Sequence, residues 1–208
     1  MEINNKGTFE FFREMWERNA ELNAAEIKRR GKSLFELRGR HPAGIGLVIC
    51  AGPSLDADIE ILKKYSKQIS ADSRFRVICC DIAARRVSEI INIDYIVTLD
   101  AQKATAGYFK DLKCGGAKLI APVFIEPEVL KNFTGEIYFY NLQYQPEQDF
   151  FNRLAKISEI NCFIMCGSVV SNTAVIFSII TGMTRAIVIG NDLGFTDMKI
   201  YARGMRED

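Results

Sequence analysis

Polar residues that could take part in chemistry stand at the ends of short apolar segments. The groups, in chain order, are Gly52-Pro53-Ser54, Asp81, Asp100-Ala101-Gln102, Gly167-Ser168 and Gly190-Asn191-Asp192. In an open α/β sheet, ligands bind outside the carboxyl ends of the strands, so these groups are the candidates for a binding or catalytic site. A purely structural sheet also places caps and turns at its strand ends. Each group therefore has two interpretations.

Gly52-Pro53-Ser54 opens a predicted helix directly after the first apolar segment. Glycine lets a ligand approach the backbone, Ser54 is a favourable N-cap, and free N–H groups at a helix start favour a phosphate. The segment has neither the spacing of a GxGxxG loop nor the Lys of a Walker loop. An ordinary turn with a cap explains it equally well, and Asp56 and Asp58 would repel an anion bound close by. Both interpretations stay open.

Asp81, Asp100 and Asp192 each follow an apolar run. Such a carboxylate can have a structural role, as the cap of the next helix. It can also have a functional role, either as the acceptor of a hydrogen bond from a ribose, a base or an acceptor hydroxyl, or as the ligand of a divalent ion. Two of them on neighbouring strands favour a functional role.

A helix that is apolar almost all round begins after Gly167-Ser168, so we expect it to be buried. Ser168 is then either its cap or part of a second anion site.

The composition excludes several classes of function. The chain of 208 residues is 48% hydrophobic with a net charge of +1, which excludes disorder and argues against nucleic-acid binding. We expect no membrane span and no signal peptide. The six cysteines include no CxxC pair, so we expect a reduced, cytoplasmic protein without a zinc site. The one histidine, His41, precedes the first strand, and no Ser-His-Asp or Cys-His arrangement is indicated.

Helices and strands alternate along most of the chain. A helical pattern covers 8–38, and His41-Pro42-Ala43-Gly44 separates an N-terminal helical segment, 1–43, from a second unit, 44–208. Strands are expected at 46–52, 75–81, 94–100, 117–122, 136–141, 161–167 and 185–192, and the main helices at 55–67, 104–112, 147–157 and up to 180. Because these strands are apolar without alternation, both faces of the sheet are covered. The pattern predicts a Rossmann-like, doubly wound α/β fold with a mainly parallel sheet, preceded by an N-terminal helix.

Several segments, taken in order, resemble the MAF (motility associated factor) flagellin glycosyltransferases. They are GPSL, the strand-end Asp81, VTLDAQ, GSVV before the apolar helix, and IVIGNDLGFT followed by Tyr201-Ala202-Arg203-Gly204. The upstream helix with Trp16-x-x-Asn19-x-x-x-Asn23 is similar to the segment that precedes the core domain in that family. The GPS loop and the strand ends are also similar to those of bacterial sialyltransferases, which use CMP-activated nine-carbon sugars. The resemblance extends over essentially the whole chain.

The resemblance implies a glycosyltransferase that moves a sialic-acid-like nonulosonate from its CMP donor to a Ser or Thr hydroxyl, with flagellin as acceptor and no cofactor. The implied nucleotide- and donor-binding residues are Gly52, Pro53, Ser54, Asp81, Gln102, Gly167 and Ser168. Asp100 or Asp192 would be the general base on the acceptor hydroxyl. The sialyltransferases use a C-terminal catalytic His, whereas this chain has no His after His41.

Two alternatives remain. Archaeal 6-hydroxymethyl-dihydropterin diphosphokinases share the GPSL-type loop and would need ATP and Mg²⁺ held by Asp81, Asp100 or Asp192. They carry a Gly-Gly-Phe-Thr-Asp-Gly-Asp type of segment where this chain reads CGSVVSNTA. The other alternative is a module that binds a nucleotide or docks on flagellin without turnover.

MAF proteins continue beyond the GNDL strand, so we expect 44–208 to be a C-terminally truncated domain. The sequence leaves the sugar, the acceptor and the oligomeric state open.

Overall fold

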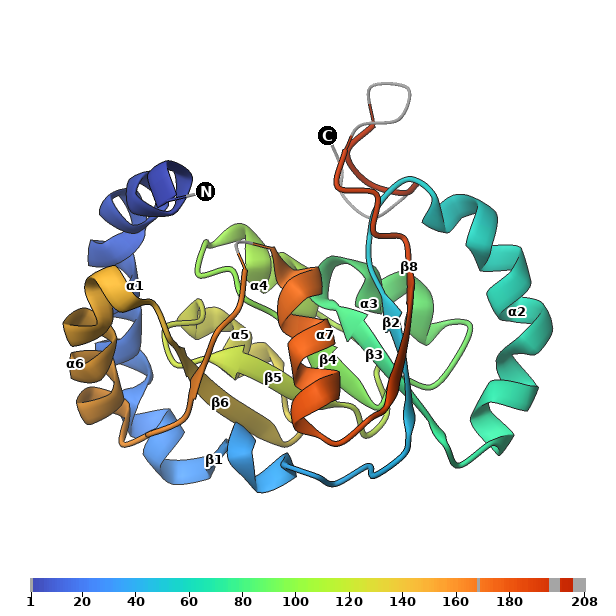
Figure 1. The fold of residues 1–208 in the computed structure, drawn as a ribbon, viewed down its shortest axis with the longest axis horizontal. Helices are drawn as coiled ribbons and strands as arrows, with labels where there is room; N and C mark the ends of the chain where they lie inside the picture. The colour runs from blue at the N-terminus through green and yellow to red at the C-terminus, as the bar shows by residue number, and fades with distance from the viewer. Residues whose placement is uncertain (1, 168, 195–198, 204–208) are drawn as a thin grey trace.

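A computed structural model describes residues 2–167, 169–194 and 199–203. Its centre is a sheet in the order β1-β6-β5-β4-β3-β2-β8, with β7 paired to β6 (Figure 1). The strands are β1 (Gly31–Ser33), β2 (Ile45–Ile49), β3 (Phe75–Cys80), β4 (Tyr95–Val97), β5 (Lys118–Pro122), β6 (Ile137–Leu142), β7 (Phe163–Ile164) and β8 (Arg185–Ile189). Every described pairing is parallel, which confirms the predicted Rossmann-like α/β fold.

The order of the strands determines where a ligand can enter. From β2 the chain steps outward through β3, β4, β5 and β6, and it then returns to place β8 on the other side of β2. The direction of winding therefore reverses beside β2. In doubly wound sheets the crevice outside the carboxyl ends at this reversal is the usual ligand position.

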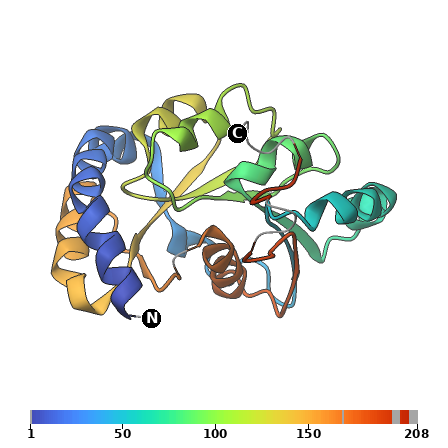
Figure 2. The same cartoon turned by 90° about the horizontal axis from the view of Figure 1, so that it is seen from above.

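The helices surround the sheet on both faces and at both edges. They are α1 (Glu2–Arg30), α2 (Leu55–Ala71), α3 (Asp81–Ser88), α4 (Ala104–Phe109), α5 (Pro127–Asn132), α6 (Gln148–Ser158) and α7 (Val170–Ile180), with short 3₁₀ turns at Leu34–Leu37 and Gln145–Glu147. Figure 2 shows α3, α4 and α5 on one face and α7 on the other, with α1 and α6 beyond one edge and α2 beyond the opposite edge. The N-terminal helix comes first in the chain, as predicted.

The central strands are apolar because both of their faces are covered. Val48, Ile78, Ile96 and Ile120 have no exposed surface. A parallel sheet between two helical layers has no polar face, so its strands show no alternation of apolar and polar residues. The expected strands are confirmed in order, although several are shorter than the apolar segments that predicted them.

The predicted helix over 8–38 differs most from the structure. The helix α1 ends at Arg30, and the next three residues form β1, which pairs with β6. A Cβ atom at Gly31 would lie 2.5 Å from the carbonyl oxygen of Ile27, so the close approach at this point requires glycine. The polar pattern after Arg30 is helix-like, but the pairing that ends the helix involves β6, more than 100 residues away in the sequence.

Two other expectations are corrected. The segment 161–167 contains only the two-residue strand Phe163–Ile164. The helix α7 is not buried all round, because Ile179 is 65% exposed. The helix α7 packs against β2, β3 and β4 of the sheet. Within the described part of the chain, the apolar residues on its outer side have no second layer of structure over them, although the sequence pattern predicted one.

No helix in the described part of the chain is long and apolar enough to cross a membrane. All six cysteines lie within the described residues, and none forms a disulfide. The division of the chain into 1–43 and 44–208 stays a prediction.

Candidate active site

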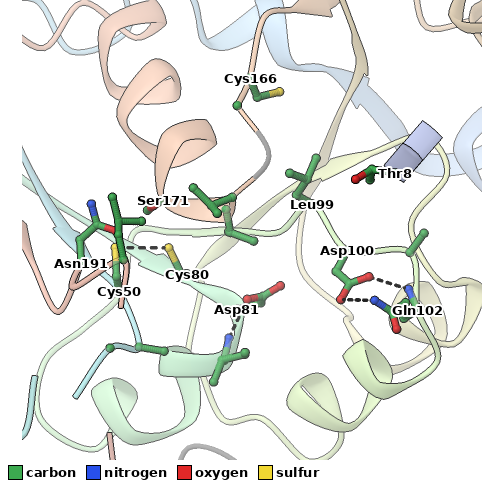
Figure 3. Close-up of a pocket in the computed structure, with 18 of the residues that line it drawn as sticks. Thr8, Cys50, Cys80, Asp81, Leu99, Asp100, Gln102, Cys166, Ser171 and Asn191 are labelled. Carbon is green, nitrogen blue, oxygen red and sulfur yellow. Dashed lines mark hydrogen bonds between the residues drawn. The ribbon is translucent and has the colours of Figure 1, made fainter. Parts of the chain in front are cut away.

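A cavity of about 680 Å³ lies at the carboxyl ends of the strands. Gly52, Asp81, Asp100, Gly167 and Asp192 all line it, although they follow different strands. Figure 3 shows Asp81 and Asp100 on one side and Asn191, Cys50 and Ser171 on another. The sheet therefore brings together the groups that the strand ends predicted.

The GPS loop is held by the end of β8. The Gly52 N–H donates to the Gly190 carbonyl oxygen at 2.8 Å, and the Ser54 N–H donates to Asp192 Oδ2 at 2.9 Å. A Cβ atom at Gly52 would lie 2.2 Å from that same carboxylate oxygen, so glycine is what allows the contact. The Asp192 carboxylate thus occupies the start of α2, where a phosphate was expected.

The Ser54 side chain does not cap α2 by a hydrogen bond. Ser54 is exposed and Pro53 is half-buried, and neither is among the residues that line the cavity. The contribution of this loop to the cavity therefore comes from Gly52. Roles for Pro53 and Ser54 in ligand binding stay predictions.

Asp81 is the most buried of the three carboxylates, with 4% of its surface exposed. It begins α3, accepts a 2.7 Å hydrogen bond from Thr98 Oγ1 on Oδ2, and accepts a 2.8 Å hydrogen bond from the Ile82 N–H on Oδ1. Burial raises the pKa of Asp81 to about 6, although these two hydrogen bonds lower it, and the Asp100 carboxylate nearby raises it further. Asp81 therefore changes protonation close to neutral pH.

Asp100 closes a tight turn after β4. Its Oδ1 accepts the Gln102 N–H at 2.9 Å, and its Oδ2 contacts Gln102 Nε2 at 3.4 Å (Figure 3). Its side chain is partly exposed in the cavity. An accessible carboxylate whose orientation is held by a backbone N–H has the chemistry of a general base or a hydrogen-bond acceptor.

The start of α7 forms another part of the wall. Gly167 and Ser171 line the cavity, and a Cβ atom at Gly167 would lie 2.1 Å from Asn172 Nδ2. Ser168 lies outside the described residues, so its predicted role is untested.

Aromatic side chains form the wall opposite the GPS loop, and the strand ends did not predict them. They are Phe9, Phe12 and Trp16 of α1, Tyr108, Tyr144 and Phe151. In the sequence, Phe9, Phe12 and Trp16 are the apolar face of a helix, and packing alone explains such a face. The signal that could have identified the wall is Trp16, the single tryptophan of the chain, in the helix that the resemblance includes.

The C-terminal described residues lie over the GPS side of the cavity. The Ala202 N–H donates to the Ala51 carbonyl oxygen at 2.8 Å, and Ile200 and Tyr201 line the cavity. Asp56 anchors this segment, since its Oδ1 contacts Arg86 Nη1 at 2.6 Å and the Arg203 N–H at 3.2 Å. Asp56, in the acidic first turn of α2, therefore has a structural role, because it holds the C-terminal segment in place.

The cavity is acidic. It contains three carboxylates, and none of the described residues that line it is Lys, Arg or His. In the described part of the chain, no group of three or more His, Cys, Asp or Glu side chains is arranged to hold a metal ion. Each of the three carboxylates is instead engaged with a backbone N–H. The residues present do not fit a preformed Mg²⁺ site.

The fold and the sequence were each compared with those of known proteins. The fold is similar to that of a MAf glycosyltransferase from Magnetospirillum magneticum AMB-1, with a TM-score of 0.64 and 22% sequence identity over 86% of this chain. The chain spans only 28% of the length of that protein. No curated protein sequence matches. The profile of the MptE-like family, described as 6-hydroxymethylpterin diphosphokinase MptE-like, matches residues 18–198. The chain belongs to this MptE-like family.

Proposed function

We propose that the protein is a glycosyltransferase that binds a CMP-activated nonulosonate in the cavity and transfers the sugar to a Ser or Thr hydroxyl. The observation that carries the proposal is a single cavity lined by Gly52 of the GPS loop, by an aromatic wall and by the carboxylates of Asp81, Asp100 and Asp192. The fold likeness to a MAf glycosyltransferase supports this class of reaction. We further propose flagellin as the acceptor and the cytoplasm as the compartment.

In this reaction the acceptor oxygen attacks the anomeric carbon of the donor, and the bond from that carbon to the CMP phosphate oxygen breaks. The acceptor proton passes to a carboxylate, and the backbone N–H groups at the helix starts stabilise the departing phosphate. Asp100 suits the role of base better than Asp192, because the Asp192 carboxylate lies on the Ser54 N–H at the start of α2. Asp192 and the phosphate would compete for that N–H.

Asp81 suits binding rather than the base role. Its carboxylate is at the buried edge of the cavity and already accepts hydrogen bonds from Thr98 and Ile82. A nucleotide hydroxyl that reaches this edge would meet an acceptor fixed in orientation. The pKa of Asp81, raised to about 6 by burial, makes this binding sensitive to pH near neutrality.

The alternative is diphosphate transfer from ATP to a hydroxymethylpterin, which the family description favours. The aromatic wall offers flat surfaces on which a pterin or purine ring could stack. This reaction implies Mg²⁺, for which the described carboxylates form no preformed site. The glycosyltransferase is the leading proposal because the fold is similar to that of a MAf glycosyltransferase.

The test is nucleotide binding by calorimetry with CMP and with ATP, each with and without Mg²⁺. Trp16 lines the cavity and is the single tryptophan, so its fluorescence gives a second, independent reading of binding. The Asp81→Asn variant should weaken CMP binding. The exposed Asp149, in the first turn of α6 and outside the cavity, provides the matched control Asp149→Asn.

Metal-independent binding of CMP, weakened only by Asp81→Asn, would support the proposal and justify a transfer assay with the activated sugar. A preference for ATP with Mg²⁺ would replace it with the diphosphokinase. If neither nucleotide bound, a docking module without turnover would be the remaining function. In the transfer assay, Asp100→Asn should lower kcat by a factor on the order of 10² to 10⁴ and leave CMP affinity nearly unchanged.

A further inference from the structure

Two buried asparagines on α1 clamp the loops at the carboxyl ends of β4 and β5. Asn19 is 0% exposed and Asn23 is 1% exposed. Asn19 Nδ2 donates to the carbonyl oxygens of Ala101 at 3.0 Å and Phe124 at 3.3 Å. A buried amide is tolerated only when it is hydrogen-bonded, so these contacts determine how α1 docks.

One of these acceptors belongs to the peptide group that holds Asp100. The Ala101 carbonyl and the Gln102 N–H are the two ends of a single peptide group, which is planar and trans, so they point in opposite directions. The carbonyl end is held by Asn19 Nδ2, and the N–H end donates to Asp100 Oδ1 at 2.9 Å. Ala101 is 2% exposed, which leaves this peptide group little room to rotate.

We propose that Asn19 is a positioning residue, which orients the Asp100 carboxylate in the cavity through the 101–102 peptide group. When the carbonyl is fixed on the α1 side, the N–H must point away from α1, towards Asp100. Without Asn19 the peptide group can rotate, and the hydrogen bond that holds the carboxylate is lost. The consequence for catalysis rests on the proposed function, but the positioning itself does not.

The surroundings of Asn19 fix its amide in the required orientation. Arg18 Nη2 donates to Asn19 Oδ1 at 3.1 Å, which leaves the Nδ2 end for the two loop carbonyls. Trp16 stacks on Phe124, with ring centroids 4.9 Å apart and 30° between the rings. The second acceptor of Asn19 is the carbonyl of that same Phe124. The helix α1 therefore supplies both part of the aromatic wall and the clamp on the loop that carries Asp100.

Asn23 provides a matched control one turn further along α1. Its Nδ2 also donates to two carbonyl oxygens, those of Val123 at 3.1 Å and Ile125 at 2.8 Å. Neither acceptor residue lines the cavity, and neither carbonyl belongs to the peptide group that donates to Asp100. Replacing either asparagine leaves two buried carbonyls without a donor, so the loss of stability should be similar. Only the change at Asn19 should reach Asp100.

The experiment compares Asn19→Leu with Asn23→Leu in the full chain without ligand. Hydrogen exchange of the Gln102 amide, followed by NMR, reports the peptide group directly. We expect exchange at Gln102 to become at least about tenfold faster in Asn19→Leu, and to change less than about twofold in Asn23→Leu, under conditions where both variants are folded. If Asn19→Leu does not fold, Asn19→Ser and Asn23→Ser give the same comparison with smaller changes.

Unchanged exchange at Gln102 in the Asn19 variant, or an equal acceleration in the Asn23 variant, would overturn the proposal. CMP binding and sugar transfer are then measured on the same proteins, and we expect kcat to fall in the Asn19 variant only. If wild-type protein bound no nucleotide while Gln102 exchange still depended on Asn19, the proposed function would fail and the positioning role would stand.

Discussion

The Asp192 carboxylate accepts a hydrogen bond from the Ser54 backbone N–H, with 2.9 Å between Oδ2 and N, across 138 residues of sequence. A negative charge at the start of a helix is favourable, because the free N–H groups carry partial positive charge. Asp192 therefore stabilises the GPS loop while it takes the position that a phosphate would need. Under the proposed function, Asp192 and the nucleotide phosphate would compete for the Ser54 N–H.

We expect Asp192→Asn to bind CMP about twofold to fivefold more tightly than the wild type, because a neutral amide no longer repels the phosphate. The same change should lower the free energy of unfolding by about 1 kcal/mol, since the charge at the helix start is lost. Calorimetry and urea unfolding measure the two effects. The control is Asp149→Asn, an exposed residue in the first turn of α6 and outside the cavity, which should not change CMP affinity. Weaker CMP binding in Asp192→Asn would show that the carboxylate helps to hold the ligand.

Gly52→Ala should destabilise the protein by about 1–3 kcal/mol, because the new methyl group would overlap the Asp192 carboxylate and the Gly190 carbonyl. The comparison is Gly107→Ala, at an exposed position of α4, where a Cβ atom would meet nothing within 4 Å. That change should stabilise the protein by about 0.4–1 kcal/mol, since alanine loses less backbone entropy on folding. Chemical unfolding of both variants tests the pair. Equal stability for the two would rule out a close contact between Gly52 and Asp192.

Stability should depend on pH through Asp81. Burial raises the pKa of Asp81 from 3.8 to about 6, so the folded state binds more protons than the unfolded state between these values. The contribution of Asp81 is fully present below about pH 4 and is lost as the pH rises towards 6, a difference of about 3 kcal/mol. In Asp81→Asn this decrease should disappear. Urea unfolding at several pH values measures it, and a decrease of unchanged size in the variant would contradict the assignment.

Stability should also depend on pH through His41, but in the opposite direction to the effect of Asp81. His41 Nε2 lies 2.7 Å from the Tyr95 hydroxyl, and burial together with the charges of Arg76, Arg40 and Lys118 lowers the pKa of His41 from 6.5 to about 4. Between these values the unfolded state binds the extra proton, so the stability from His41 is present above about pH 6.5 and is lost as the pH falls towards 4.

His41→Gln should therefore reduce the loss of stability between about pH 6.5 and pH 4. The control is Tyr95→Phe, which removes the hydrogen-bond partner but no group that titrates in this range, because burial raises the pKa of Tyr95 to about 12. That variant should lower stability by a similar amount at every pH. A pH dependence that is the same in wild type and His41→Gln would exclude His41 as its source.

The sequence alone predicted the fold class and the groups at the edge of the sheet. The apolar runs around Val48, Ile78 and Ile120 indicated strands buried on both faces, and the structure confirms this. Asp81, Asp100 and Asp192 were singled out because each follows such a run, and all three line one cavity. These predictions succeeded because continuous apolar runs and the residues that end them are local properties of the chain, and parallel strands bring their ends to one edge.

Only the tertiary structure decided what each of these groups touches. The carboxylate of Asp192 lies on the Ser54 N–H, Asn19 of the first helix holds the Ala101 carbonyl 82 residues away, and Trp16 faces the cavity rather than only the core. The helix predicted over 8–38 ends at Arg30 because the following residues pair with β6. Such contacts depend on how helices and strands pack in three dimensions. Residues far apart in sequence make them, so no local pattern of residue types encodes them.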